Sequence, residues 1–335
     1  MIDTILLAHG SGGTMSHQLI TDIFREAFAN PTLDQMLDAA VVEVPTGRIA
    51  MTTDSFVVDP IFFPGGDIGK LAICGTVNDL AVSGAEPKFL SAAFIIEEGF
   101  PLADLKKIVG SMRDTAVRAG IMIVTGDTKV VEKGSADKVF INTTGVGILP
   151  AGRYLSPTCV KPGDQVIISG NLGDHGLTIL AQREGLSFST PVESDCAPLN
   201  AMIGEALKYG DAVRCMRDPT RGGLATTLNE IARQGKVGIT IQEDLIPVSP
   251  EVAGACDMLG MDPLYMANEG KVIIFAAAEA AADIVAALRQ TAEGKNAAVI
   301  GEVAAEPPGM VLLETTLGAT RVLGMLEGEH LPRIC

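Results

Sequence analysis

The last residue of the chain is a cysteine, Cys335, which follows Pro332, Arg333 and Ile334. A thiol at a chain end contributes little to a hydrophobic core, so we expect it to be accessible and to take part in chemistry at its sulfur. Chance placement and a disulfide to a neighbouring chain are the alternatives that the tail alone leaves open. Prenylation fits badly, because a prenylated cysteine stands four residues from the end.

Three aspartates stand beside other polar residues at strand ends or inside apolar segments. Asp54 ends a predicted strand, Asp79 follows Asn78 in an apolar helix, and Asp127 follows a strand in a run that ends at Lys129. We predict that the three aspartates hold one or more Mg²⁺ ions with nucleotide phosphates, because Mg²⁺ takes few carboxylates and completes its shell with water and phosphate oxygen. For any single aspartate, helix capping or turn formation is the alternative.

Four glycine-containing runs adjoin predicted helices or strands: His9–Gly13, Gly170–Gly176, Arg217–Gly223 and Asn268–Lys271. Glycine lets a backbone approach a ligand closely, and N–H groups at a helix start point toward anions. The first run is not a Walker A loop, because Gly13 is followed by Thr14 instead of lysine. Tight turns would explain the glycines, but they give no reason for Arg221, Glu269 and Lys271.

Composition excludes several classes of protein. The 335 residues are 47% hydrophobic, which is enough for large cores and for two domains. The net charge of −16 would repel nucleic acid and anionic membranes, so a phosphate ligand would need metal ions. No run approaches the roughly 18 apolar residues of a membrane span. The six cysteines form no CxxC or zinc spacing, and we expect a cytoplasmic protein with reduced thiols.

Both halves of the chain alternate helices with strands, which predicts α/β domains. Prolines and glycines interrupt the pattern between 150 and 164, so we place a boundary there: an N-terminal domain 1–150, a C-terminal domain 151–327 and a mobile tail 328–335. The predicted helices are 14–29, 68–83, 102–119, 174–183, 196–209, 223–234, 250–259 and 279–291. The predicted strands are 48–53, 89–96, 121–124, 138–149, 165–169, 212–216, 237–242, 271–276 and 298–303.

Five segments together resemble HypE, the carbamoyl dehydratase family of hydrogenase maturation: His9–Gly13, Gly75–Ala81, Thr125–Lys129, Arg217–Gly223 and Pro332–Cys335. The resemblance covers essentially the whole chain, and the terminus is its most specific part. HypE belongs to a superfamily with aminoimidazole ribonucleotide synthetase, selenophosphate synthetase and thiamine monophosphate kinase, whose members bind ATP and phosphorylate an oxygen or a related atom.

The resemblance implies a two-domain aminoimidazole ribonucleotide synthetase-like fold, with mixed helices and sheets, that forms a homodimer through its N-terminal sheets. It also implies a reaction at Cys335. The carbamoyltransferase HypF places a carbamoyl group on the thiol, and ATP-dependent dehydration converts it to a thiocyanate. The cyano group then passes to iron on the HypC–HypD scaffold, as a ligand for a nickel–iron hydrogenase.

The reaction assigns roles to the candidate residues. An amide oxygen leaves only after it becomes a phosphate ester, which requires charge neutralisation around the phosphates and then a base for the amide protons. We expect Glu269 to be the base, with Lys129 assisting. His175 would orient the carbamoyl oxygen or a phosphate, or be structural, and Lys271 would contact phosphate or pair with Glu269. The other nucleotide-binding candidates are Gly12, Gly13, Asn78, Thr128, Arg221, Gly222 and Gly223.

Two kinds of alternative remain. Selenophosphate synthetase uses a cysteine or selenocysteine near the N-terminal glycine-rich run, and this chain has none there. The two other related enzymes have no use for a terminal thiol. A non-catalytic carrier would bind nucleotide and only present Cys335, and it should hydrolyse no ATP when its thiol is loaded.

Overall fold

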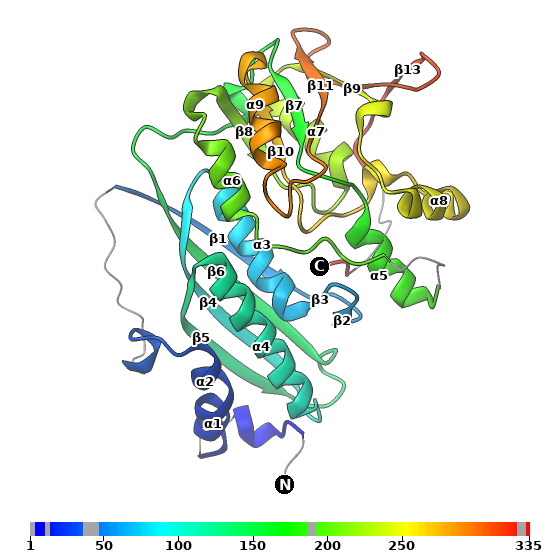
Figure 1. Ribbon diagram of the computed structural model, residues 1–335. Helices are drawn as coiled ribbons and strands as arrows, with labels where there is room; N and C mark the ends of the chain where they lie inside the picture. The colour runs from blue at the N-terminus through cyan, green and yellow to red at the C-terminus, as the bar shows by residue number, and fades with distance from the viewer. Residues whose placement is uncertain (1–3, 11–13, 36–46, 187–191, 327–332) are drawn as a thin grey trace.

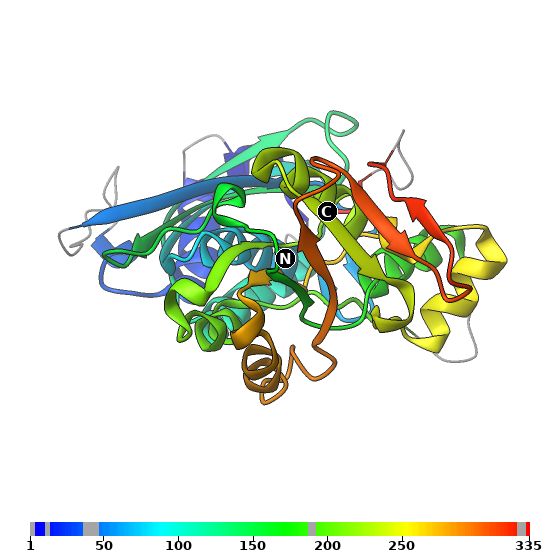
Figure 2. The same cartoon turned by 90° about the horizontal axis from the view of Figure 1, so that it is seen from above.

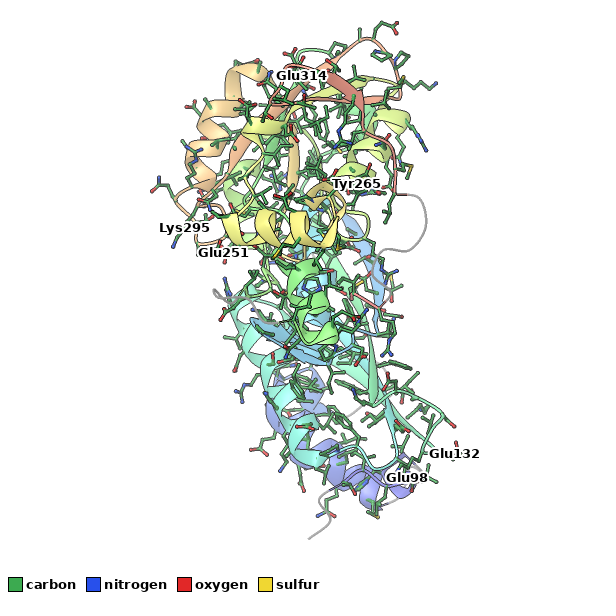
Figure 3. The ribbon with its side chains drawn as sticks, turned by 90° about the vertical axis from the view of Figure 1, so that its right-hand side faces the viewer. Glu98, Glu132, Glu251, Tyr265, Lys295 and Glu314 are labelled. Carbon is green, nitrogen blue, oxygen red and sulfur yellow. The ribbon has the colours of Figure 1, made fainter. Side chains whose placement is uncertain are left out.

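The computed structural model describes residues 4–10, 14–35, 47–186, 192–326 and 333–335. They form two α/β units, as predicted, each built on its own sheet (Figure 1). The units are stacked end to end, with Glu132 at the free end of the N-terminal unit and Glu314 at that of the C-terminal unit (Figure 3). In the described ranges, no helix combines the length and apolarity needed to cross a membrane.

The N-terminal unit is a four-stranded sheet in the order β1-β6-β4-β5, with helices packed on one face. Strand residues alternate between that buried face and an open face, as the period of two requires. On the open face Ile49, Met51 and Ile95 are 58%, 70% and 45% exposed. The elements are α1 (Thr14–Leu19), α2 (Glu26–Phe28), β1 (Arg48–Phe56), β2 (Phe62–Phe63), β3 (Gly66–Asp67), α3 (Ile68–Val82), β4 (Glu86–Glu97), α4 (Leu102–Ala119), β5 (Met122–Val131) and β6 (Val139–Leu149).

The C-terminal unit is a seven-stranded sheet in the order β13-β12-β9-β11-β7-β10-β8, with helices on both faces. Adjacent residues of one strand enter opposite cores: Ile168 packs with α7, while Ile167 packs with α6 and α9. In Figure 2, β13 and α8 lie together at one end of the molecule. The elements are β7 (Gln165–Ile168), α5 (Asp174–Glu184), α6 (Asn200–Leu207), β8 (Val213–Arg217), α7 (Gly223–Gly235), β9 (Gly238–Gln242), α8 (Pro250–Leu259), β10 (Ile273–Ala276), α9 (Ala278–Leu288), β11 (Ala298–Ala304), β12 (Val311–Glu314) and β13 (Thr320–Val322).

Three differences from the predicted elements bear on the site. Asp54 and Asp127 lie inside β1 and β5 instead of after strands, because neighbouring strands continue the backbone ladder past them. The helix predicted at 196–209 begins only at Asn200, so residues 192–199 are an irregular segment. The first predicted helix contains a π-helical stretch, Ile20–Arg25, between α1 and α2.

Asn78 of α3 joins the two units. Its Oδ1 accepts a hydrogen bond from the Leu199 N–H at 2.8 Å, and its Nδ2 donates to the carbonyls of Ala197 at 3.1 Å and Glu269 at 3.4 Å. Cys196 and Ala267 also belong to the core of the N-terminal unit. The segments that lead to the C-terminal sheet are therefore fixed against α3.

The end of the chain is docked between the units, beside α5 (Figure 1). The N–H groups of Val57 and Asp59 donate to the backbone oxygens of Cys335 at 3.1 Å and Arg333 at 3.3 Å, in the pattern of an antiparallel pair. Cys335 is only 9% exposed. The prediction of an accessible terminal thiol is therefore wrong for this state of the molecule, because backbone pairing draws residues 333–335 into the core. The rest of the predicted mobile tail, 328–332, lies outside the described residues.

The junction gives the first prediction. Asn78→Ala leaves two carbonyls and one N–H without their partner in a buried place, and we expect the free energy of unfolding to fall by about 2 to 4 kcal/mol. Urea unfolding without nucleotide measures this. Asn296→Ala is the control, since the exposed amide of Asn296 bonds only to Asn171. An unchanged midpoint for Asn78→Ala, with lost nucleotide affinity, would restore Asn78 to the nucleotide site.

Candidate active site at the buried C-terminal thiol

The sulfur of Cys335 lies beside an arginine. The Nε of Arg221 donates to Sγ at 3.1 Å. Burial and the nearby Glu269 raise the pKa of the Cys335 thiol to about 11, although Arg221 opposes the shift. In the docked position the sulfur is therefore a neutral thiol at physiological pH, which is a weak nucleophile.

Glu269 is a buried carboxyl group with spare capacity. The side chain is almost inaccessible, and Oε1 has no hydrogen-bond partner among the described residues. Burial first, and then Cys196 and Asp218, raise the pKa of Glu269 well above its ordinary value. An orphaned buried oxygen is uncommon in native proteins and calls for an explanation such as a catalytic role. This group can hold a proton next to whatever the terminal thiol carries.

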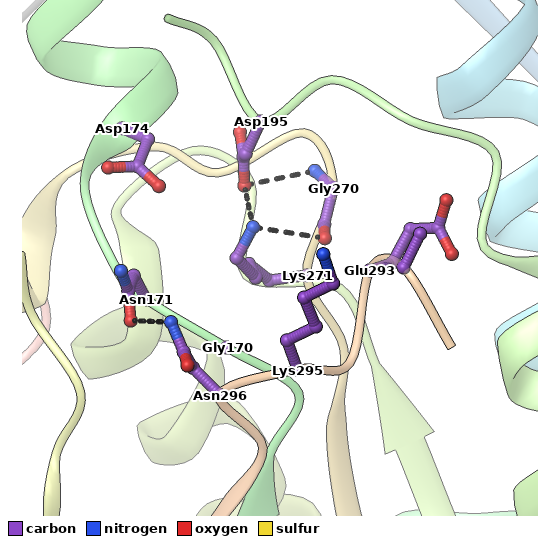
Figure 4. A pocket seen from close by; sticks show the side chains of 10 residues that line it. Gly170, Asn171, Asp174, Asp195, Gly270, Lys271, Glu293, Lys295 and Asn296 are labelled. Atoms are coloured by element: carbon purple, nitrogen blue, oxygen red, sulfur yellow. Dashed lines mark hydrogen bonds and ion pairs between the residues drawn. The ribbon is translucent and has the colours of Figure 1, made fainter. Parts of the chain in front are cut away.

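Asp195 fixes the backbone that carries Glu269. Its Oδ1 accepts the Glu269 N–H at 3.0 Å, and its Oδ2 accepts the Gly270 N–H at 3.2 Å and the Lys271 ammonium at 3.0 Å (Figure 4). Burial alone would raise the pKa of Asp195, but Lys271, His175 and the Glu269 N–H bond outweigh it and lower that pKa. A Cβ on Gly270 would meet the Asp195 carbonyl at 1.8 Å, so only glycine fits.

Lys271 therefore pairs with Asp195 instead of Glu269, which corrects one of the two predicted roles for Lys271. Sequence reasoning missed Asp195 altogether. It lies in the irregular segment 192–199, which we predicted in part as helix, and no motif marks it. The pocket that these residues line, about 330 Å³, also contains Asp174, whose pKa burial raises to about 6 (Figure 4).

His175 holds the tail by its backbone. The imidazole is fully buried, and burial lowers its pKa, so it is neutral. Nε2 lies 2.8 Å from the Ile334 carbonyl, which can only accept, so Nε2 carries the proton. Nδ1 lies 2.7 Å from the Ser194 hydroxyl, which donates to it and itself accepts the Cys196 N–H. Of the two predicted roles, the structure supports a hydrogen-bonded structural histidine.

A second group of carboxylates, Asp54, Asp79 and Asp218, lies where β1 contacts α3. Burial and Asp79 raise the pKa of Asp54 to about 6, and burial and Asp79 raise that of Asp218 to about 7. Burial also raises the pKa of Asp79, whose Oδ2 accepts a hydrogen bond from Thr52. Like charges that raise one another's pKa are stabilised in their ionised form by a cation. Asp218 was not among the predicted ligands, although its place between Arg217 and Pro219 is a visible signal.

A cleft of about 680 Å³ opens over this group, with Asp79, Asp218, Arg217 and Arg221 among its lining residues. In the described part of the chain, no three His, Cys, Asp or Glu side chains approach closely enough to hold a metal ion by themselves. Mg²⁺ fits this arrangement only with phosphate oxygens and water completing its shell, which is its usual habit.

The predicted residues on β5 lie elsewhere. Asp127 accepts hydrogen bonds from the Lys129 ammonium at 2.8 Å and the Thr128 N–H at 2.9 Å. Gly126 stands opposite Ala92 of the buried face, so Asp127 and Lys129 belong to the open face, whereas Asp54 faces α3. One chain therefore does not bring Asp127 to the other aspartates, or Lys129 to Glu269. Their predicted roles would need a second copy of the chain.

The remaining nucleotide-binding predictions fare differently. Gly12 and Gly13 lie outside the described residues. The amide of Asn78 is used at the junction between the units, so its predicted contact with nucleotide finds no free donor. The Gly223 N–H donates to the Thr220 carbonyl at 3.0 Å, which removes it as a phosphate donor. Gly222 has a left-handed φ of 75° before α7, which explains the glycine by backbone conformation.

Comparison with known proteins gives the same two-part division. A family model described as AIR synthase related protein, N-terminal domain, matches residues 36–149, and its C-terminal counterpart matches residues 161–313. The carbamoyl dehydratase HypE of Azotobacter vinelandii is 52% identical over 332 residues, covering 99% of this chain and 97% of that protein.

Two solved structures extend the comparison. A crystal structure of hydrogenase maturation protein HypE in complex with ATP superposes with a TM-score of 0.96 at 50% identity, covering 99% of this chain and all of the other. A crystal structure of a HypE–HypF complex matches with a TM-score of 0.82 at 48% identity, covering 94% and 100%. The resemblance seen in the motifs is confirmed over 99% of this chain: it belongs to the HypE family, the carbamoyl dehydratases of hydrogenase maturation.

Proposed function

We propose that this chain converts a carbamoyl group on the thiol of Cys335 to a thiocyanate at the expense of ATP, as a lyase-type carbamoyl dehydratase. The observation that carries the proposal is the docked thiol itself, 3.1 Å from Arg221 and beside the orphaned carboxyl of Glu269. A family of carbamoyl dehydratases, one of them solved with ATP, supports the substrate and the nucleotide.

The chemistry balances as the loss of one water. ATP supplies the phosphoryl group that turns the carbamoyl oxygen into a phosphate ester, so that phosphate can leave. The carbamoyl nitrogen loses its two protons, the C–O bond breaks, and a C≡N bond remains on sulfur. Glu269 is placed to accept a proton, and its raised pKa means that it keeps that proton afterwards. Arg221 offsets negative charge at the sulfur and the adjoining group.

The triphosphate would lie in the cleft over Asp79 and Asp218, with Arg217 and Arg221 on its wall. A second cleft of about 730 Å³ adjoins the first, and Leu155 lines both. The cationic residues that line the second cleft are Arg153, Lys161 and Arg214. Such a basic lining is notable on a chain of net charge −16 and suits phosphate oxygens. Asp54, Asp79 and Asp218 would hold Mg²⁺, which neutralises charge on the phosphates when bound.

The residues of β5 enter this scheme through a homodimer. The open face of the N-terminal sheet exposes Ile49, Met51 and Ile95, which a second copy would cover. The predicted contributions of Asp127 to the metal and Lys129 to proton transfer would then come from the partner subunit's sheet. Thr128 lies opposite Phe94 on the other face of β5, so its predicted contact with the nucleotide would not come through this open face.

The proposal also names partners and a compartment. The solved HypE–HypF complex supports HypF as the donor of the carbamoyl group, and the HypC–HypD iron scaffold would accept the cyano group. All six cysteines are free thiols, which suits the reducing cytoplasm. A carrier that only presents its thiol is the second candidate, but a carrier gains nothing from a buried carboxyl beside the sulfur.

The first test is the mass of the C-terminal peptide after incubation with carbamoyl phosphate, HypF and Mg²⁺. Cys335 should gain a carbamoyl group and lose one water only when hydrolysable ATP is added. Cys335→Ala should keep the fold and ATP binding but accept no group. A carbamoyl that persists with ATP would favour the carrier, and an unmodified Cys335 would remove the thiol from the reaction.

The raised pKa of Glu269 gives a pH prediction. A base must be ionised, so the rate of dehydration of the loaded chain should rise with pH through the neutral range, by up to about tenfold per unit. In Glu269→Gln the rate should fall by about 100-fold or more and lose this pH dependence. Glu205→Gln, at an exposed surface pair with Lys208, is the control. A retained pH slope in Glu269→Gln would assign the base elsewhere.

The cluster of Asp54, Asp79 and Asp218 gives a prediction of how the stability of the chain responds to pH and to Mg²⁺. The pKa values of Asp54 and Asp218 are raised in the folded chain. Their contribution to the free energy of unfolding is therefore full below about pH 4 and is lost as the pH rises through about 6 and 7. Without metal, the free energy of unfolding of the parent chain should fall between pH 5 and pH 8. In Asp218→Asn that fall should be smaller by about 2 kcal/mol. It should also weaken stabilisation by Mg²⁺ with ATP, measured by urea unfolding.

The exposed Asp283→Asn is the matched control for that experiment. If Asp218→Asn kept both the pH slope and the stabilisation by Mg²⁺ with ATP, Asp218 would leave the proposed metal group.

A further inference from the structure

The side chain of Arg333 is held by the N-terminal unit at a place apart from the thiol. Its Nε donates to the Val57 carbonyl at 2.9 Å, and its Nη1 pairs with Asp137 at 2.5 Å. The guanidinium carbon also lies 6.0 Å from the centre of the Phe140 ring. Two strand-end segments, after β1 and before β6, thus recognise one arginine two residues from the chain end.

The C-terminal unit grips the same residue by its backbone. The Nη2 of Arg183, at the end of α5, donates to the Arg333 carbonyl at 3.0 Å and to the Asp59 carbonyl at 2.7 Å, and its Nε donates to Asp59 at 3.2 Å. Arg183 therefore ties the tail to the segment that the tail pairs with. His175, on the first turn of α5, holds the next carbonyl.

The backbone of Arg333 is in an unfavourable conformation. Its φ is 52°, in the left-handed region that residues other than glycine seldom adopt. Such a conformation persists only where the surroundings impose it, and it favours release once they are removed. The contacts of Arg183 and Asp137 with Arg333 thus help to oppose release of the last three residues.

We propose that Arg183 and Asp137 are positioning residues that form a binding site for Arg333, the tail clamp, and that this clamp sets how long Cys335 stays at the buried site. Among the described residues, Arg183 and Asp137 hold the tail through Arg333, two residues before the sulfur. Docked Cys335 is 9% exposed, so a bulky donor or acceptor reaches its sulfur only when the clamp opens. The biological meaning rests on the proposed function, in which the thiol visits partner proteins.

The clamp is tested on the full chain by the rate at which an uncharged maleimide labels Cys335. The readout is the mass of the peptide 330–335, released by a glutamate-specific protease after the reaction. Arg183→Ala removes the hydrogen bond to the Arg333 carbonyl and the two to the Asp59 carbonyl, and it should speed labelling about tenfold or more. Asp137→Asn should speed it a few-fold, because the pair that it weakens is half exposed. Arg183→Lys should fall between Arg183→Ala and the parent.

Arg25→Ala is the matched control, because Arg25 forms a comparable surface pair with Asp34 far from the tail. Labelling at the parental rate in Arg183→Ala, or an equal increase in Arg25→Ala, would overturn the proposal.

If Arg183→Ala loosens the whole fold, the buried Cys215 will also be labelled faster. A charge exchange then tests the clamp without Arg183→Ala. Asp137→Arg should speed labelling of Cys335, and Asp137→Arg with Arg333→Asp should return it toward the parental rate. Failure of the exchange to slow labelling would reject the clamp. None of these measurements needs carbamoylation or ATP, so the clamp and the dehydratase can fail separately.

Discussion

One buried ion pair, between Asp195 and Lys271, organises the candidate active site. Their side chains are 3% and 9% exposed, and a buried pair of this kind repays its desolvation only when additional hydrogen bonds complete it. Here the N–H groups of Glu269 and Gly270 supply those bonds. The pair therefore fixes the course of the backbone more than it adds stability. Because the backbone of Glu269 is held in this way, its carboxyl needs no structural partner and is left for chemistry.

Burial explains why the two candidate reacting groups are neutral. Taking a thiol and a carboxyl out of water disfavours their charged forms. Glu269 further raises the pKa of Cys335, while Cys196 and Asp218 further raise that of Glu269. A neutral docked thiol is a poor nucleophile, so under the proposed function a carbamoyl group would be acquired in the undocked state. In that proposal the docked sulfur would carry the group while Glu269 and Arg221 act on it. The same burial excludes water, which would hydrolyse an activated carbamoyl.

Sequence patterns could predict the two α/β units and most of the elements, because the apolar periods are strong. They also singled out Cys335, Glu269, Arg221 and Asp79, all of which lie at the junction. They could not predict Asp195, because its importance comes from contacts with residues more than seventy positions later in the chain. The error at Asp127 had two sources: β5 continues past it, and a register shift at Val124 moves it to the open face, opposite Ala93, where simple alternation from Ile123 would have buried it. Burial of the last cysteine was missed, since a pairing partner for residues 333–335 leaves no trace in the tail itself.

A chain end is well suited to a carrier that must be both buried and released. The backbone bonds of the tail to Val57 and Asp59 are each worth little net of water, which makes docking reversible. Specificity then has to come from side chains: Arg333 supplies a charged contact with Asp137, and Ile334 an apolar contact with the core of the N-terminal unit. Since both units bind the tail, any change in their relative position alters its docking, so the junction that aligns Glu269 also governs access to Cys335.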